Sequence, residues 1–218
     1  MLSSVGRRRE HNARTASALL DAAEQILQEG GVEALSVRSV AARIGTSTRA
    51  VYSVFGSKEQ LLVALGVRAF EMLGAGVAAL PVSDDPAADL VAAGASVFRP
   101  FALEHPALFR VAMQHAPAWN QMPVEVLGAS THAFGLLVTR VRRVQEAGLL
   151  GSHSVETATN AFHALCEGLA VGELRCGSPP GYDEKFWWEA LSCLVDGFGR
   201  DLAPDGHLRE SSQALGST

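Results

Sequence analysis

The sequence predicts an all-α protein with a small N-terminal part of three helices and a larger C-terminal helical part. Apolar residues recur at the three- and four-residue spacing of helices along most of the 218 residues. No alternating run of useful length indicates a strand, and no internal repeat is present. Serines, prolines and glycines stand between the periodic stretches, where helices begin and end.

The N-terminal sequence predicts an arm followed by a first helix. We expect residues 1–10 to form a flexible, Arg-rich arm and the helix to run from Asn12 to Glu29, ended by Gly30 and Gly31. The inward face of this helix shows helical spacing and is formed by Leu19, Leu20, Ala23, Ile26 and Leu27.

Residues 36–60 predict two short helices joined by a tight turn. Ser36 is placed to cap the first helix, and Gly45 suits the left-handed backbone that a helix exit requires. The hydroxyls of Thr46, Ser47 and Thr48 can bind the free amides that open the second helix. The inward residues of the two helices are Val37, Val40, Ala41, Ile44, Val51 and Phe55.

The second of these helices carries its polar residues on the outward side. Thr48, Arg49, Tyr52 and Ser53 supply hydrogen-bond donors and one aromatic ring. A short polar helix presented by a preceding helix fits the major groove of DNA, where base edges offer a readable pattern of donors and acceptors. The alternative is a helical hairpin buried in another kind of all-α protein.

The same stretch resembles the helix-turn-helix of TetR-type transcriptional regulators. Recurring residue types stand at fixed offsets from Arg38 to Lys58, namely Ala41, Ala42, Gly45, Ser47, Tyr52, Phe55 and the closing Ser57, Lys58 and Glu59. The chain departs from the family pattern at Arg49, Ala50 and Val54, so its operator is expected to be its own. The resemblance implies an N-terminal helix-turn-helix DNA-binding domain, here 11–56, and a C-terminal domain for ligand binding and dimerisation.

Roles at the DNA follow from side-chain chemistry. Arg49 is our first choice for a base contact, since arginine pairs with O6 and N7 of guanine. We expect Thr48 and Tyr52 to contact bases or phosphates, and Arg38, Ser47 and Lys58 to contact the backbone. The alternative for Lys58 is a lysine that merely faces solvent. For the arm 1–10, the alternatives are a solvated tail and a contact to phosphates or the minor groove.

The distribution of charge agrees with this division of roles. The net charge is −5, but residues 1–60 carry eight Arg or Lys against six Asp or Glu, whereas residues 61–218 carry ten against seventeen. An acidic C-terminal part would be repelled by phosphates, and the basic N-terminal part would be attracted to them.

The rest of the chain is read as a connecting helix and a helical domain. We expect a connector over 57–80 that starts at a capping Ser57, a boundary at Pro81–Pro86, an effector-binding and dimerisation domain over 81–202, and a disordered tail over 203–218. The helices expected within the C-terminal domain span 86–104, 106–115, 123–148, 155–176 and 183–202.

A second resemblance lies at Phe98–Phe109, where a helix ends in a His-Pro pair followed by an aromatic residue. This passage is similar to the effector domain of the TetR subgroup often called the WHG type. At 162–169 the chain keeps the glycine of the subgroup motif, but it has Glu167 where a histidine is expected and no tryptophan.

The family resemblance implies a small-molecule pocket between C-terminal helices, and such pockets are mostly apolar with a few polar groups. The residues that offer this mixture are Phe98, Phe101, Met113, His115, Trp119, Met122, Phe134, Phe162, His163 and Cys166. The alternative for each of them is ordinary core. His115 and Trp119 lie in a proline-broken segment that could act as a gate, and His163 interrupts an apolar helix face.

The last two helices carry more apolar surface than one inward face requires, and the family resemblance implies that they form a four-helix bundle between two copies of the chain. The residues expected at this interface are Ala158, Leu165, Leu169, Gly172, Trp187, Leu191, Leu194 and Phe198. The alternative is that both helices are buried inside a monomer.

Catalytic and metal-binding patterns are missing from the sequence. It contains no GxSxG, Walker loop or HExxH, and the single pair His163 and Cys166 falls short of the four ligands of structural zinc. The three cysteines lack CxxC spacing, no apolar run of membrane length lacks a charge, and polar sequence follows the N-terminal arginines. We therefore expect a cytoplasmic protein that is no enzyme and has no metal or cofactor.

These observations together predict a homodimeric regulator of transcription, most simply a repressor that a small hydrophobic effector releases from operator DNA. The alternatives are an activator or an effector-independent regulator of the same fold, and, from another class, a helical ligand carrier or enzyme.

Overall fold

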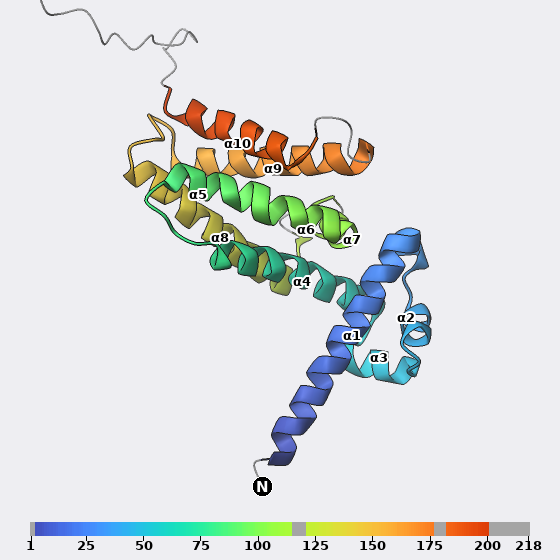
Figure 1. Ribbon diagram of the computed structural model, residues 1–218. Helices are drawn as coiled ribbons and strands as arrows, with labels where there is room; N and C mark the ends of the chain where they lie inside the picture. Colours follow the sequence, from blue (N-terminus) through green and yellow to red (C-terminus); the bar gives the residue numbers. More distant parts are fainter. Residues whose placement is uncertain (1–2, 115–120, 177–181, 201–218) are drawn as a thin grey trace, which may run out of the picture. The chain divides into compact units, whose positions relative to one another are not determined.

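The computed structural model describes residues 3–114, 121–176 and 182–200, and within these ranges it is helical without a strand (Figure 1). The all-α prediction is therefore confirmed. The described residues form two compact units, one within residues 1–76 and 100–134 and the other within residues 77–99 and 135–218. This division differs from the expected domain scheme, because residues 100–134 group with the N-terminal helices.

Helix α1 (Ser3–Ala34) is longer than the sequence indicated. It begins at Ser3 instead of Asn12, because no proline interrupts residues 3–11 and most of them tolerate a helix well. The stop expected at Gly30 and Gly31 is present as an interruption, since Gly31 has a φ of 67°. The buried stripe of α1 consists of Leu19, Ala22, Ala23, Ile26 and Leu27.

The next three helices are α2 (Val37–Arg43), α3 (Thr48–Phe55) and α4 (Lys58–Ala79), close to their expected bounds. Helix α4 buries Leu61, Leu65, Ala69 and Leu73 along one side. Among the described helices, only α4 has the length and hydropathy of a membrane span, a composition that core helices share.

The helix expected over 86–104 is continuous but changes its hydrogen-bond pattern. It consists of α5 (Pro86–Ala92), the π-helical segment η1 (Ala93–Phe98) and α6 (Arg99–Glu104). The helix expected over 106–115 is likewise divided into α7 (Pro106–Phe109) and the π-helical η2 (Arg110–Gln114). Such a change of pattern leaves no mark in the hydrophobic period, which explains why the sequence did not reveal it.

The remaining helices are α8 (Val124–Glu146), α9 (Val155–Cys176) and α10 (Glu184–Phe198). The bounds of α9 match the prediction, whereas α10 ends at Phe198 instead of residue 202. In the second unit, α10 packs against α5, η1 and α9 (Figure 1). This packing completely buries Trp187 and Leu191 of α10 and Phe162 of α9.

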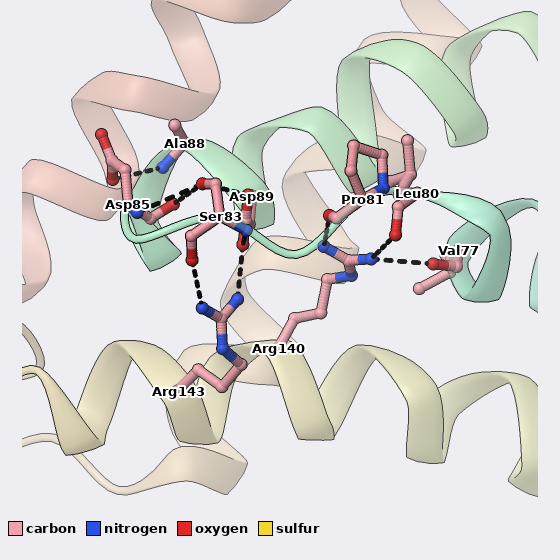
Figure 2. Close-up of polar contacts among 9 residues, drawn as sticks. All are labelled: Val77, Leu80, Pro81, Ser83, Asp85, Ala88, Asp89, Arg140 and Arg143. Carbon is pink, nitrogen blue, oxygen red and sulfur yellow. Dashed lines mark hydrogen bonds and ion pairs between the residues drawn. The ribbon is translucent and has the colours of Figure 1, made fainter.

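The connection after α4 is held by Arg140 of α8. Its guanidinium donates hydrogen bonds to the carbonyl oxygens of Val77 (3.0 Å), Leu80 (2.9 Å) and Pro81 (3.2 Å), as Figure 2 shows. Arg140 is only 6% exposed. It satisfies carbonyl groups that the end of a helix leaves without intrahelical partners.

One turn further along α8, Arg143 binds the start of α5 (Figure 2). Its guanidinium donates to the Asp89 carboxylate and to the carbonyl oxygen of Ser83, and Asp89 accepts hydrogen bonds from the amide (2.9 Å) and hydroxyl (2.7 Å) of Ser83. Asp85 caps α5 by accepting from the amide of Ala88 at 2.9 Å. Two arginines of one helix thus hold both sides of the 80–85 loop.

Candidate functional site

The two short helices are defined by local hydrogen bonds that the sequence predicts. The Ser36 hydroxyl accepts from the amide of Ser39 at 3.0 Å, and the Ser39 hydroxyl accepts from the amide of Ser36 at 2.9 Å, which forms a reciprocal capping box. Gly45 follows α2 with a φ of 66°, a left-handed conformation that glycine adopts without strain. Ser47 then caps α3 by accepting from the amide of Ala50 at 3.2 Å.

Helix α3 has one buried side and one exposed polar side. Val51 is 1% exposed, and Phe55 is half-buried. The outward residues are all exposed, namely Thr48, Arg49, Tyr52 and Ser53. Tyr52 has 54% of its surface accessible, so its ring and hydroxyl are both available to a partner. This is the outward face that the sequence predicts, with exposed Val54 beside it.

The remaining basic residues around these helices differ in their exposure and in their hydrogen bonds within the chain. Arg38 is exposed on α2. Arg43 is held by Glu29 of α1 through two hydrogen bonds of 2.9 and 2.6 Å, and this side-chain hydrogen bond lowers the pKa of Glu29. Nζ of Lys58 donates to the carbonyl oxygen of Val32 at 3.0 Å. Lys58 therefore also ties the start of α4 to the segment that follows Gly31, a role that the sequence did not indicate.

A groove of about 700 Å³ lies beside α3 in the first unit, with walls formed by apolar residues of α1 and α4 such as Leu20 and Val67. Arg68 lines it and binds Asp21 through Nη2 at 2.6 Å. Its Nη1 is buried and has no hydrogen-bond partner among the described residues. Arg68 could not be singled out from the sequence, because a single arginine on a long helix forms no recognisable motif.

Four of the expected effector residues lie together in the second unit, where η1 meets α9. Phe98, Phe162 and Cys166 are buried, and the rings of Phe98 and His163 approach edge to face with centroids 5.9 Å apart. A Cβ atom on Gly94 would lie 3.0 Å from Sγ of Cys166 and 3.2 Å from Cζ of Phe162, so glycine permits this close approach.

The electrostatics of this cluster favour neutral groups. Burial lowers the pKa of His163, although the negative charge of Glu167 acts in the opposite direction. Burial also raises the pKa of the Cys166 thiol. A neutral imidazole and a protonated thiol suit an uncharged or weakly polar ligand. Within the described ranges no group of three or more His, Cys, Asp or Glu side chains could hold a metal ion.

Four other expected effector residues lie in the first unit. Phe101 is buried in the first unit, where its ring centroid lies 6.0 Å from that of His105. Met113, Met122 and Phe134 are partly buried in the same unit. His115 and Trp119 lie outside the described residues.

The expected dimer residues fall into two groups. Five of them are buried within the single chain, namely Ala158, Leu169, Trp187, Leu191 and Phe198. The three that remain partly exposed are Leu165, Gly172 and Leu194. No partner chain is present, so the interface stays a prediction, with the second group as its accessible part.

Two groups of polar contacts were not predicted from the sequence. Nδ1 of His105 lies 2.7 Å from Oε1 of Glu24, which joins the α6–α7 corner to α1. In the second unit, buried Glu173 accepts hydrogen bonds from Arg99 and Trp187. A signal for Glu173 did exist: it continues the buried stripe of α9 at helical spacing after Phe162 and Cys166, and an acidic residue there requires partners.

Comparisons with known proteins agree with this geometry. Residues 19–65 match the model of bacterial regulatory proteins of the tetR family, and residues 91–192 match that of the tetracyclin repressor-like C-terminal domain. Together these matches cover about two thirds of the chain. They do not test the WHG subgroup, which stays a prediction. No curated protein is recognisably similar to the chain.

Solved structures share the fold across most of the chain. A protein of unknown function from Rhodococcus sp. RHA1 is 27% identical, with a TM-score of 0.71 over 84% of this chain and 94% of its own. The TetR family transcriptional regulator PfmR of Thermus thermophilus is 22% identical, with a TM-score of 0.61 over 83% and 96%. The fatty acid degradation regulator FadR of Bacillus halodurans is 15% identical, with a TM-score of 0.68 over 83% and 93%.

Proposed function

Because this chain belongs to the tetR family of bacterial regulatory proteins, we propose that it is a ligand-responsive regulator of transcription and most simply a repressor. The observation that carries the proposal is the exposed polar face of α3, a short capped helix that offers Thr48, Arg49, Tyr52 and Ser53 to a partner. Its width of about 10–12 Å suits the major groove, which is about 12 Å wide.

Each residue of the interface has a proposed role. Arg49 donates to O6 and N7 of a guanine, while Thr48, Tyr52 and Ser53 bind neighbouring base edges or phosphates. Arg38, Ser47 and Lys58 contact the DNA backbone and so fix the position of α3 in the groove. Lys58 keeps donors for this purpose, because an ammonium has three and the carbonyl of Val32 uses one.

The functional unit is proposed to be a homodimer. Two copies joined through α9 and α10 would present two α3 helices to half-sites about 34–36 Å apart on one face of the duplex. The partly exposed Leu165, Gly172 and Leu194 would meet the partner, and the buried residues behind them would hold both helices in place. A monomeric mass in light scattering at micromolar concentration would count against this assembly.

The effector is proposed to be a small hydrophobic molecule that binds beside Phe98, Phe162, His163 and Cys166. The neutral imidazole of His163 can make one directed hydrogen bond to such a molecule, and the surrounding rings supply apolar contact. The effector would bind better to a conformer with another orientation of α4, so that the two α3 helices no longer match their half-sites. The groove beside Arg68 is the second candidate position, since an unpaired Nη1 lines it.

The proposal places the protein in the cytoplasm, as a regulator and not an enzyme, with operator DNA, an effector and a second copy of itself as its partners. It is tested by selecting duplexes from a random library with the wild-type protein and measuring the enrichment. We expect a two-fold symmetric site with half-sites about ten base pairs apart. A selection that enriches no sequence would contradict the proposal and favour a helical carrier or an enzyme.

The direction of regulation is tested with the selected site placed upstream of a reporter gene. Repression that is relieved by a ligand supports the proposal, whereas increased expression identifies an activator of the same fold. Repression that none of a broad set of hydrophobic ligands relieves identifies an effector-independent regulator. Thermal stabilisation by a ligand that is lost in His163→Ala but kept in Arg68→Met would place the effector in the η1–α9 cluster.

A further inference from the structure

Half of the basic residues among the first 60 lie in front of the helix-turn-helix. Residues 3–18, the first half of α1, carry four arginines against one glutamate. Residues 36–60, which hold α2 and α3, carry four basic residues against one acidic residue, and residues 19–35 between the two stretches carry four acidic residues and no basic one. The first half of α1 is therefore as basic as the helix-turn-helix, and an acidic stretch separates them.

Contacts within the chain occupy two of the basic residues of the helix-turn-helix. Arg43 is bound to Glu29, and the ammonium of Lys58 donates to the carbonyl of Val32. Arg38 and Arg49 are the exposed cations that remain on α2 and α3. Together with Lys58, which keeps two donors, they supply few cations for an attraction to DNA that comes mainly from neutralising phosphates.

The basic stretch is part of a helix and not an extended arm. Helix α1 begins at Ser3, and the residues from Arg14 to Ala18, ahead of the buried Leu19, are exposed or partly exposed. Sixteen residues of helix span about 24 Å. Figure 1 shows this half of α1 continuing past α2 and α3, which belong to the same compact unit.

The helical conformation decides which part of the DNA this segment can reach. An α-helix with its side chains is about 10–12 Å wide, whereas the minor groove is about 6 Å wide. A helix therefore cannot enter the minor groove as an extended arm does. Phosphates at the rim of the duplex remain accessible to it, and arginine binds them well.

We propose that the N-terminal half of α1, through Arg7, Arg8, Arg9 and Arg14, binds the phosphate backbone of DNA flanking the base pairs that α3 reads. The inference rests on the proposed DNA binding of α3 and adds a second, sequence-independent contact. It assigns a sequence-independent part of the affinity of each subunit to this segment and most of the sequence preference to α3.

The test compares two triple variants with the same net charge. Arg7→Gln/Arg8→Gln/Arg9→Gln removes three charges from the segment, and glutamine preserves its helical propensity. Arg142→Gln/Arg175→Gln/Arg200→Gln removes three exposed charges from the second unit. Fluorescence anisotropy then gives the affinity for a library-selected duplex and for an unrelated duplex over a range of salt concentrations.

We expect the N-terminal variant to lose affinity for both duplexes by the same factor, so that the ratio between them stays constant. The slope of log K against log salt should fall by about 2 to 3, since each phosphate contact contributes about 0.9. The control variant should keep the wild-type slope.

An unchanged slope in the N-terminal variant would overturn the inference, and so would an equal loss in the control, which would mark a general effect of net charge. A loss confined to the selected duplex would overturn it as well, because base reading would then be involved. A wild-type protein that does not prefer the selected duplex would contradict the proposed function itself, which separates the two failures.

Discussion

Oε2 of Glu173 accepts a hydrogen bond of 2.8 Å from Nε1 of Trp187, and both residues are fully buried. The carboxylate also binds Arg99, with Nη2 at 2.8 Å from Oε1 and Nε at 3.1 Å from Oε2. These hydrogen bonds link Arg99, at the end of η1, to α9 and α10. A buried carboxylate is tolerated here because three N–H donors, two from Arg99 and one from Trp187, are directed at it.

Glu173→Ala should destabilise the protein strongly. It leaves the guanidinium of Arg99 and the indole of Trp187 without their acceptor, and breaking a buried ion pair costs about 3–5 kcal/mol. Glu173→Gln should cost less, because the amide oxygen can still accept one hydrogen bond. Urea unfolding followed by circular dichroism measures both, with exposed Glu146→Ala as the control. A loss for Glu173→Ala as small as that of the control would contradict this account.

The stability of the protein should depend on pH through Asp89. Burial raises the pKa of this carboxyl, but the amide of Ser83, the guanidinium of Arg143 and the Ser83 hydroxyl outweigh burial and bring the pKa from 3.8 to about 2. Because the folded-state pKa is depressed, the stabilisation is present above pH 3.8 and is lost as the pH falls towards 2.

The measurement for Asp89 is the difference in unfolding free energy between the wild type and Asp89→Asn as a function of pH. The difference should be constant above about pH 5 and shrink steadily below about pH 4. Asp84→Asn, an exposed aspartate in the same loop, serves as the matched control. A difference that stays the same down to pH 2 would show that Arg143 and Ser83 do not favour the charged form.

Arg49→Ala should reduce sequence preference as well as affinity. A bidentate arginine contact to guanine contributes about 1–3 kcal/mol of discrimination, so the variant should bind the selected duplex more weakly and unrelated DNA nearly as before. Arg43→Ala is the matched control, since Arg43 lies in the same domain but is bound to Glu29. Equal losses on both duplexes for Arg49→Ala would assign Arg49 to the backbone instead.

Lys58→Ala should lower the affinity for all DNA sequences by the same factor, because a phosphate contact carries no information about the bases. It should also lower stability slightly, since the hydrogen bond to the carbonyl of Val32 is lost. Anisotropy on selected and unrelated duplexes, together with urea unfolding, separates the two effects. A variant that loses stability but binds both duplexes like the wild type would leave Lys58 with its structural role alone.

Gly94→Ala should destabilise the second unit. The new Cβ would clash with Cδ1 of buried Leu191, so α10 or its side chain must move, and overpacking of this kind costs about 1–3 kcal/mol. Gly128→Ala in α8 is the matched control, because nothing lies within 4 Å of its Cβ position. The control should stabilise the protein by up to about 1 kcal/mol. If both variants had the same stability, the packing at η1 would be looser than described.

The helix-turn-helix could be predicted in detail because its determinants are local. The Ser36 cap, the left-handed Gly45, the Ser47 cap and buried Val51 all act within one or two turns, and each was expected from its neighbours in the sequence. The grouping of Phe98, Phe162, His163 and Cys166 could not be predicted, because the sequence placed them in one set with Phe101, which lies in the other unit, and the effector site stays a prediction.

The sequence by itself determined that the chain is all-α, where most of its helices begin and end, and which side of α3 faces outward. Only the tertiary structure decided that Arg99 meets Glu173, 74 residues away, and that Arg140 binds the carbonyl groups at the end of α4. Helix periods and caps are encoded by residues three or four positions apart, whereas such ion pairs depend on how distant helices pack. The basic composition of residues 3–18 is read directly from the sequence, whereas their helical conformation was shown by the structure.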